Sequence, residues 1–240
     1  MVHLLDSSAA EYPQIGTIDE DGTFTAVQTG RDVTGTLTVT YGETSCTLPV
    51  TVGSSQPFDD TKGHWAESYI TELYYAGTLQ GSEKNGKLYY RPDASMTRQE
   101  FIVAMMRYLG TDLSAYASVQ LPFDDSGSIA SWAKSAMRAA YQLGYLTGSK
   151  TNGKLLAKPG STISRQEAMT ILSRTKDFAD ADLNVLSAFS DSGKIADWAR
   201  TALAQMTQQK IISGSKGKLN PTGKVTRAEV AKMLYMLSES

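Results

Sequence analysis

Three stretches decide the fold of this chain, because they are copies of one another: MTRQEFIVAMM at 96–106, ISRQEAMTIL at 163–172 and VTRAEVAKML at 225–234. Each has Ser or Thr at its second position, Glu three residues later, and then apolar residues three and four apart. This pattern is typical of a capping box that opens an amphipathic helix. The predicted N-caps are Thr97, Ser164 and Thr226, and the predicted third helical positions are Glu100, Glu167 and Glu229.

An arginine follows each predicted N-cap: Arg98, Arg165 and Arg227. A cation at the first helical position meets the helix dipole with the wrong sign, which costs roughly 0.3 to 1 kcal/mol. Helix stability alone would not select it. The arginine either pairs with a nearby carboxylate in solvent or contacts an anionic ligand, and its recurrence in three copies favours the ligand. On this interpretation, Arg98→Ala weakens binding and leaves folding almost unchanged.

A long internal repeat surrounds these stretches. Trp65, Trp132 and Trp198 are 67 and 66 residues apart, whereas the three arginines are 67 and 62 apart, so the third copy is shorter. Each tryptophan follows a Phe-x-Asp element and precedes a Gly-Ser pair by sixteen residues, and a proline stands six residues before each arginine. Each copy therefore predicts a helix beginning near the tryptophan, a Gly-rich loop, an extended piece and a second, capped helix.

The predicted copies span residues 57–110, 122–176 and 188–238, with connectors between them. Two short helices bury little apolar surface alone, so we expect the copies to pack against one another. The predicted fold is mainly α, with three helix-loop-helix repeats packed as a pseudo-threefold bundle. In this prediction, each tryptophan lies on the inner face of the first helix.

Residues 1–55 carry a different signal. Alternation in TGTLTVTY and TLPVTV, with DG and YGE turn signals, predicts strands and hairpins within residues 15–52. The motif G-x-I-D-x-x-G-x-F-T-A followed by T-V-T-Y resembles the last strands of a bacterial immunoglobulin-like module. We therefore expect a small, partial immunoglobulin-like β segment at residues 1–55.

Composition excludes several classes of function. The 240 residues include 23 basic and 25 acidic side chains, a net charge of -2, which argues against a nucleic-acid footprint or a polybasic membrane patch. The single cysteine, Cys46, forms no internal disulfide, and two histidines are too few for a structural zinc site. No apolar run reaches the ~18 residues of a membrane helix, and no signal peptide is evident. We expect no cofactor, and a chain that is a fragment of a longer protein.

The repeat resembles the S-layer homology domain of bacterial cell-envelope proteins. The motifs are FDDTKGHWA, LQGS, YYRP and MTRQE in copy one, FDDSGSIASWA, LTGS, LAKP and ISRQE in copy two, and FSDSGKIADWA, ISGS, LNP and VTRAE in copy three. The resemblance implies an extracellular, wall-bound monomer with ligand grooves between neighbouring copies. It implies a secondary cell-wall polysaccharide as ligand, often with a pyruvate ketal whose carboxylate binds in the grooves.

The resemblance also suggests which residues bind. Alongside the three arginines, we expect the tryptophans and the loop residues Gly81, Ser82, Lys84, Gly148, Ser149, Lys150, Gly214, Ser215 and Lys216 to line the grooves. The glycines also serve as turns, and the serines either donate to sugar or face solvent. The lysines are solvated charges or a second cation for the carboxylate, and we favour the cation. For the tryptophans, a structural or groove-wall role is favoured over sugar stacking.

Several local features are assigned a structural role. The paired acids Asp59/Asp60 and Asp124/Asp125 suggest caps and turns, because neither a calcium-loop spacing nor a nucleophile accompanies them.

Two departures from the family pattern are expected to differ in effect. Gln99 and Gln166 replace the usual alanine at what we expect to be an exposed, harmless position. In copy three, Lys210 replaces a glycine and the loop is shorter, so its groove is predicted to be the weakest.

The leading hypothesis is a noncatalytic wall anchor, in which three weak grooves on one body raise apparent affinity by avidity. One alternative is a protein self-assembly module of an envelope lattice. Another is the anchoring part of a larger envelope enzyme. A hydrolase within these residues has little support.

Overall fold

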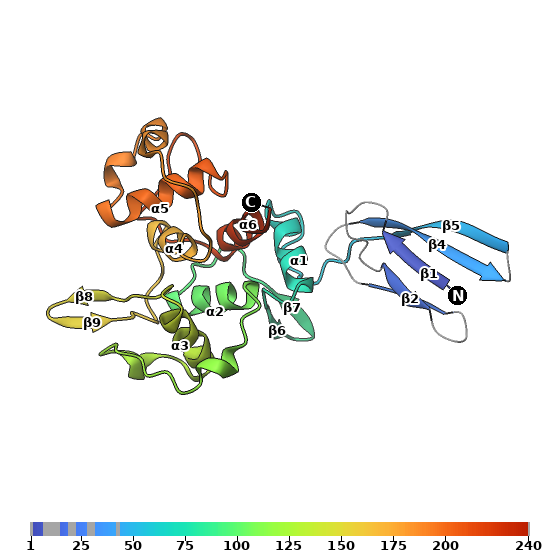
Figure 1. Cartoon of the computed structure of the whole chain (residues 1–240), viewed down its shortest axis with the longest axis horizontal. Coiled ribbons are helices and arrows are strands. Elements are labelled where there is room, and N and C mark those ends of the chain that lie inside the picture. The colour runs from blue at the N-terminus through green and yellow to red at the C-terminus, as the bar shows by residue number, and fades with distance from the viewer. Residues whose placement is uncertain (1, 7–14, 19–22, 28–31, 42–43, 240) are drawn as a thin grey trace. The chain divides into compact units, whose positions relative to one another are not determined.

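The structure is a computed structural model that describes residues 2–6, 15–18, 23–27, 32–41 and 44–239. The chain divides into two compact units, Met1–Tyr90 and Arg91–Ser240. The elements of each unit are labelled in Figure 1. The division falls inside the first sequence copy, so the second helices of all three copies belong to the second unit.

The N-terminal part of the first unit is made of strands: β1 (Val2–Asp6), β2 (Gly16–Ile18), β3 (Phe24–Ala26), β4 (Val33–Tyr41) and β5 (Thr44–Val52). Strands β1, β4 and β5 form an antiparallel sheet in the order β1-β4-β5, and β2 pairs with β3. A small core of Ile15, Val33 and Val52 lies among them. The prediction of strands and hairpins is confirmed, while the immunoglobulin-like identity stays a prediction.

The rest of the first unit holds α1 (Glu67–Tyr75) and a hairpin of β6 (Ser82–Lys84) and β7 (Lys87–Tyr89). Helix α1 buries Ile70 and Leu73. The hairpin turns at Asn85 and Gly86, with φ of 54° and 73°. Positive φ at both central residues is the geometry of a type I′ turn, for which Asn-Gly is the preferred pair.

The second unit alternates helices with short strands: α2 (Arg98–Tyr108), η1 (Leu113–Tyr116), η2 (Ser126–Ser128), η3 (Ser131–Ala133), α3 (Lys134–Gln142), β8 (Ser149–Thr151), β9 (Lys154–Leu156), α4 (Arg165–Leu172), η4 (Leu183–Ala188), η5 (Ser192–Lys194), α5 (Asp197–Gln208) and α6 (Arg227–Ser238). In Figure 1 the β8–β9 hairpin projects away from these helices. Across the described ranges, every helix is too short or too polar to span a bilayer.

The prediction of a mainly α bundle is wrong. The described residues form nine strands in four antiparallel sheets beside six α-helices, which makes the fold a mixture of α and β. The error has a local cause. Each hairpin strand in the repeats is three residues long, too short to show a period-two pattern, so the sequence predicts a Gly-rich loop where the structure has a hairpin.

A closed ring of backbone hydrogen bonds links the three copies within the second unit. Met96 N donates to Val225 O at 3.1 Å, Val225 N to Ile163 O at 3.1 Å, and Ile163 N to Met96 O at 3.0 Å. All three side chains are buried. Each residue stands two positions before a capped helix start, so the ring holds the N-termini of α2, α4 and α6 together.

The same region satisfies the first backbone donors of each helix. Arg98 N and Gln99 N donate to the carbonyls of Ser161 and Pro159, at 2.9 and 3.1 Å. Equivalent bonds run from the start of α4 to Gly223 and Pro221, and from the start of α6 to Ala94 and Pro92. These donors therefore bond to a neighbouring copy and are not available to a ligand.

The glutamines after the arginines also connect copies. Gln99 Oε1 accepts from Ala130 N at 3.0 Å, and Gln166 Oε1 accepts from Ala196 N at 3.1 Å. Both glutamines are half-buried rather than exposed. Each one satisfies a backbone donor just before the first helix of the next copy, so the expectation of a harmless surface position is wrong.

In copies two and three, the last Asp of the Phe-x-Asp element holds the residue before the repeat's proline. Asp191 accepts from Leu219 N at 2.9 Å and Asn220 N at 2.8 Å, and Asn220 has φ of 53°. Asp125 accepts in the same way from Ala157 N and Lys158 N, where Lys158 has φ of 52°. These carboxylates stabilise a left-handed backbone that non-glycine residues rarely adopt. The predicted structural role is confirmed for Asp125, although its carboxylate holds a backbone segment of the same copy and does not cap a helix.

Asp191→Asn is expected to cost about 1.5 to 3 kcal/mol of unfolding free energy at pH 7, the range for hydrogen bonds to a charged group. Burial alone raises the pKa of Asp191, but the hydrogen bonds from Leu219 N and Asn220 N outweigh it and hold the pKa below its usual value. A lowered folded-state pKa stabilises the fold above the unfolded pKa, and this contribution disappears as pH falls through the folded value. The difference between wild type and variant should therefore shrink below about pH 4.

Urea unfolding at pH 7 and pH 3 measures this difference. Asp180→Asn, at an exposed position in the connector, is the matched control and should stay within about 0.5 kcal/mol of wild type. A pH-independent difference for Asp191→Asn would show that the carboxylate charge is not what holds the loop.

Candidate functional site

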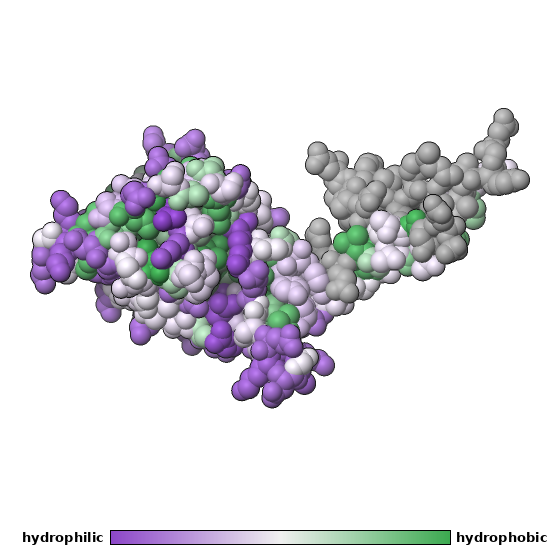
Figure 2. Space-filling view, turned by 90° about the horizontal axis from the view of Figure 1, so that it is seen from below, coloured by the Kyte–Doolittle hydropathy of each residue, from purple (hydrophilic) through white to green (hydrophobic). Residues whose placement is uncertain are grey.

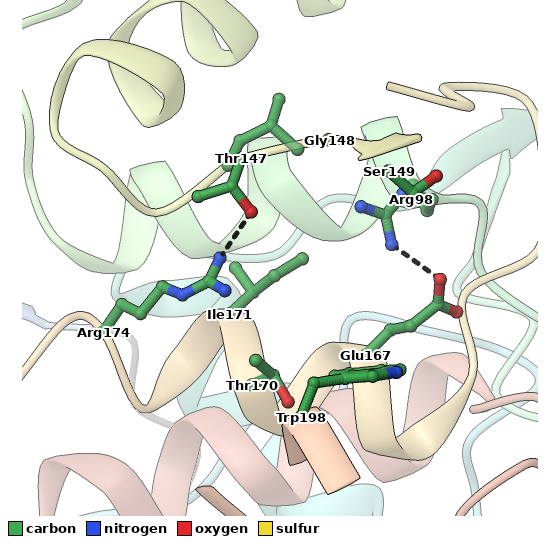
Figure 3. Close-up of a pocket in the computed structure, with 10 residues that line it drawn as sticks. Arg98, Thr147, Gly148, Ser149, Glu167, Thr170, Ile171, Arg174 and Trp198 are labelled. Carbon is green, nitrogen blue, oxygen red and sulfur yellow. Dashed lines mark hydrogen bonds and ion pairs between the residues drawn. The ribbon is translucent and has the colours of Figure 1, made fainter. Parts of the chain in front are cut away.

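The second unit contains a pocket of about 290 Å³ to which all three sequence copies contribute. Its lining residues are Arg98, Leu146, Thr147, Gly148, Ser149, Glu167, Thr170, Ile171, Arg174 and Trp198. Figure 3 shows Arg98 and Arg174 on two sides of this pocket, with Trp198 beneath Glu167. Of the predicted ligand residues, four lie together here, one from copy one, two from copy two and one from copy three.

Arg98 is a buried brace between copies one and two. Its Nε donates to Ala157 O at 2.9 Å, and its Nη1 lies 3.0 Å from Glu167 Oε1. Burial lowers the pKa of Arg98, partly offset by the negative charges of Glu167 and Asp125. The other carboxylate oxygen of Glu167, Oε2, accepts from Ser164 N at 2.8 Å. Glu167 therefore caps its own helix, α4, and also binds Arg98 of copy one.

This geometry answers why an arginine stands at an unfavourable helical position. Its charge is compensated across the copy boundary by a carboxylate that the repeat already supplies. Arg165 makes the same contact, with Nη1 at 2.9 Å from Glu229 Oε1. Its Nε is buried and has no hydrogen-bond partner among the described residues, unlike Nε of Arg98. Arg227 is half-buried at the equivalent position of α6.

Arg174 is a lining residue that sequence reasoning missed. Its Nη1 donates to Tyr145 O at 2.8 Å and more distantly to Thr147 Oγ1 at 3.4 Å. Partial burial lowers the pKa of Arg174, and the positive charge of Arg98 lowers it further. A signal was available, because the residues nine positions after the capping-box arginines are Arg107, Arg174 and Met236.

The tryptophans do not pack in the core as predicted. Trp65, Trp132 and Trp198 are 56%, 57% and 57% exposed. The first two precede their helices, which begin at Glu67 and Lys134, so neither can belong to the helix's inner face. Trp198 lies in the first turn of α5 and lines the pocket.

The Gly-Ser pair of copy two forms one wall of the pocket. Gly148 has φ of 72°, and a Cβ built on it would lie 2.6 Å from a ring carbon of Phe123. Only glycine fits this position, because the ring of the Phe-x-Asp element packs directly against the backbone. Ser149 follows at the start of β8 and is exposed.

The remaining predicted loop residues lie outside this pocket. Gly81, Ser82 and Lys84 belong to the β6 region of the first unit, and Lys150 follows Ser149 in β8. In copy three, Gly214 and Ser215 precede a tight turn at Lys216 and Gly217. All three predicted lysines are exposed.

The third copy keeps the backbone of the other two. Lys210 has φ of 58°, close to the 75° of Gly77 and the 79° of Gly144 at equivalent positions. The shorter loop is a hairpin reduced to the single bridge Ser215–Lys218, with Lys216 and Gly217 as its turn. The lysine therefore causes no change of backbone conformation, and the ranking of the third groove as weakest stays a prediction.

The described residues include no candidate metal-binding site. Among the described residues, no group of three or more His, Cys, Asp or Glu side chains is close enough to hold a metal ion. The pocket has one carboxylate, Glu167, and both of its oxygens already serve the capping box and the ion pair.

Comparison with known proteins agrees with this arrangement. A family model described as the S-layer homology domain matches residues 57–102, 122–169 and 188–231. Each matched range lies within one of the three sequence copies. They include the capping boxes, the Gly-Ser pairs and the tryptophans.

Several curated proteins are similar to this chain. An amylopullulanase of Thermoanaerobacterium thermosulfurigenes is 28% identical over 84% of the chain, and exoglucanase XynX of Acetivibrio thermocellus is 28% identical over 94%. The surface-layer 125 kDa protein of Lysinibacillus sphaericus is 32% identical over 75%. The matches cover 10%, 21% and 15% of these relatives, so the chain corresponds to a small part of each.

Proposed function

The chain belongs to the S-layer homology domain family, whose members anchor proteins at the cell surface, and we propose that it binds an acidic cell-wall polysaccharide through the pocket between its copies. The observation that carries this proposal is the pocket's charge. Arg98 is balanced by Glu167, whereas Arg174 bonds only to neutral oxygens in the contacts described above. The pocket therefore has an excess positive charge and favours an anionic ligand.

The lining also suits a sugar. The exposed indole of Trp198 offers a flat apolar face, and Ser149 and Thr147 offer hydroxyl groups. Pockets for small ligands commonly combine apolar surface with a few polar groups that fix orientation. We propose the carboxylate of a pyruvate ketal as the acidic group, and Arg174 as its cationic partner.

We propose that the module is noncatalytic. Hydrolysis of a glycosidic bond requires two carboxyl groups flanking the bond. Glu167 is the one carboxylate in the lining, and it is engaged with Arg98. The glycoside hydrolases named among the relatives extend far beyond the matched part, so an attached enzyme is compatible with this proposal.

Self-assembly within an envelope lattice is the second candidate, favoured by the similarity to a surface-layer protein. Figure 2 shows mainly hydrophilic side chains on the visible face of the helical part, with small apolar patches between them. This face therefore shows no large apolar patch of the kind that often marks a protein interface. Light scattering with and without wall polysaccharide separates the two, because only a lattice module associates without polysaccharide.

Arg174→Gln is expected to weaken binding of a soluble acidic wall fragment by about 1.5 to 3 kcal/mol, the scale of a hydrogen bond between charged groups. Calorimetry with the full chain measures this loss. Lys224→Gln, which removes an exposed cation from copy three, is the control for net charge. Equal affinity of the wild type and Arg174→Gln would contradict the proposal that the pocket's positive charge binds the ligand.

A parallel pull-down with wall before and after hydrofluoric acid extraction tests whether the polysaccharide, rather than peptidoglycan, is bound.

Trp198→Ala is expected to weaken the same binding while lowering the unfolding free energy by no more than about 2 kcal/mol. The reason is exposure, because a residue that is 57% exposed buries less than half of its surface. Thermal melting and calorimetry on one sample distinguish the two effects. A loss of 3 kcal/mol or more in stability, typical of a buried aromatic, would contradict the observed placement.

A further inference from the structure

A second cavity lies near the N-terminal end of helix α3, at the opposite end from the pocket described above. It has a volume of about 250 Å³ and is lined by residues that include Gln120, Ser126, Ile129, Lys134 and Arg138. The groove contacts the chain after the C-terminus of α3, at 146–149. A helix of nine residues is about 13 Å long, and the two cavities share no lining residue, so they are separate sites.

The lining of this cavity is positively charged. Lys134 and Arg138 are four residues apart on α3 and lie on one helix face. Arg138 Nη1 donates to Ala117 O at 2.8 Å, a contact that leaves its charge uncompensated. None of the lining residues, all of which are described, is acidic.

The carboxylates nearest in sequence are already engaged. Asp124 Oδ2 accepts from Leu155 N at 2.7 Å, and Asp125 uses both oxygens on the backbone of β9's C-terminal side. Like charges at i and i+4, such as Lys134 and Arg138, destabilise a helix. Lys134 also opens the helix, where the dipole disfavours a cation.

The repeat architecture does not require this pair of cations. At the positions of Lys134 and Arg138, copy one has Glu67 and Thr71. Copy three has Arg200 and Ala204. All three copies nevertheless form the same first helix. The paired charge is therefore particular to copy two and to its cavity.

We propose that this cavity binds a small oxyanion, a phosphate or a carboxylate group, between Lys134 and Arg138. Ser126 and Gln120 supply further polar groups at its wall, and Ile129 supplies apolar surface. Binding an anion here relieves the repulsion between the two cations. This oxyanion site is separate from the pocket and does not depend on the proposed polysaccharide binding. Either proposal can therefore be contradicted without the other.

The test is a titration of the full chain with sodium phosphate and, separately, sodium acetate, at constant ionic strength, followed by amide NMR shifts of Ser126, Gly127 and Lys134. We expect saturable shifts, about tenfold weaker binding in Lys134→Gln, and none in the double variant Lys134→Gln/Arg138→Gln. Arg200→Gln, the counterpart in copy three, should bind as wild type does. Arg174→Gln, which alters the groove, should also leave this affinity unchanged.

Every outcome of this titration either supports or overturns the proposed oxyanion site. Saturation by phosphate, acetate or both supports the site and identifies the preferred group. Shifts that rise linearly, match those caused by sodium chloride, or persist in the double variant overturn it. Arg138→Gln also removes a bond to Ala117 O, so a thermal melt accompanies it. If that variant unfolds, unchanged binding by Lys134→Gln alone overturns the proposal.

Discussion

A chain that ends at Ser187 is expected to lose the cooperative fold of residues 91–187. The truncation removes Val225, which donates to Ile163 O and accepts from Met96 N, and it removes the carbonyls of Pro221 and Gly223 that satisfy the start of α4. It also exposes Met96 and Ile163, which are otherwise buried. The lost cross-copy hydrogen bonds, at about 1 kcal/mol each, and the exposed core side chains together approach the ~5 to 15 kcal/mol that typically stabilises a whole protein.

Circular dichroism in urea and binding of a hydrophobic dye report on this loss. The 91–240 unit should unfold cooperatively in the full chain, whereas the truncated chain should show a broad transition with dye binding. A chain that begins at Gly53, and so lacks strands β1 to β5, is the opposite control, because residues 91–240 form a compact unit of their own and stay intact. Cooperative unfolding of the chain that ends at Ser187 would mean that the copies fold as independent beads.

Arg98→Ala is expected to lower the unfolding free energy by about 2 to 4 kcal/mol. Removing one partner of a buried ion pair costs about 3 to 5 kcal/mol, because the other charge is left unpaired. The Glu167 side chain keeps 33% of its surface in contact with solvent, which reduces that cost. The expectation from sequence, that folding is almost unaffected, is therefore revised.

Equilibrium unfolding in urea measures this change, with Arg107→Ala as the control on the same helix. Arg107 is exposed and should cost no more than about 0.5 kcal/mol. The double variant Arg98→Ala/Glu167→Gln is informative, because removing both charges should recover part of the loss. If Arg98→Ala were as stable as Arg107→Ala, the cross-copy ion pair would contribute nothing to folding.

The local features of this fold were predictable from sequence, because their signals are local. The structure has a capping box at each of Thr97, Ser164 and Thr226, where a hydroxyl and a glutamate three residues apart satisfy each other's backbone donors. The strands between residues 15 and 52 followed from β-branched alternation. These motifs need no knowledge of the rest of the chain.

The contacts between copies were not predictable in the same way. Arg98 and Glu167 are 69 residues apart, and the sequence offers many carboxylates to one arginine. Whether the Trp198 side chain faces the core or the pocket depends on where α5 begins and on which residues of the other copies pack beside it. Arg174 has an arginine counterpart in copy one, Arg107, but a methionine in copy three, Met236, so its sequence signal is weak. Its place beside Arg98 in the pocket gives it a role.

The ring formed by Met96, Ile163 and Val225 fixes the number of copies. Each of these residues gives one N–H and takes one N–H, so three members close the circuit and leave no open position. Open-ended repeat proteins grow by adding units at an end, since each unit contacts only its neighbours. This protein has no such end among its capped helices. A fourth copy added by gene duplication would find no vacant donor or acceptor here, and would have to fold in a body of its own.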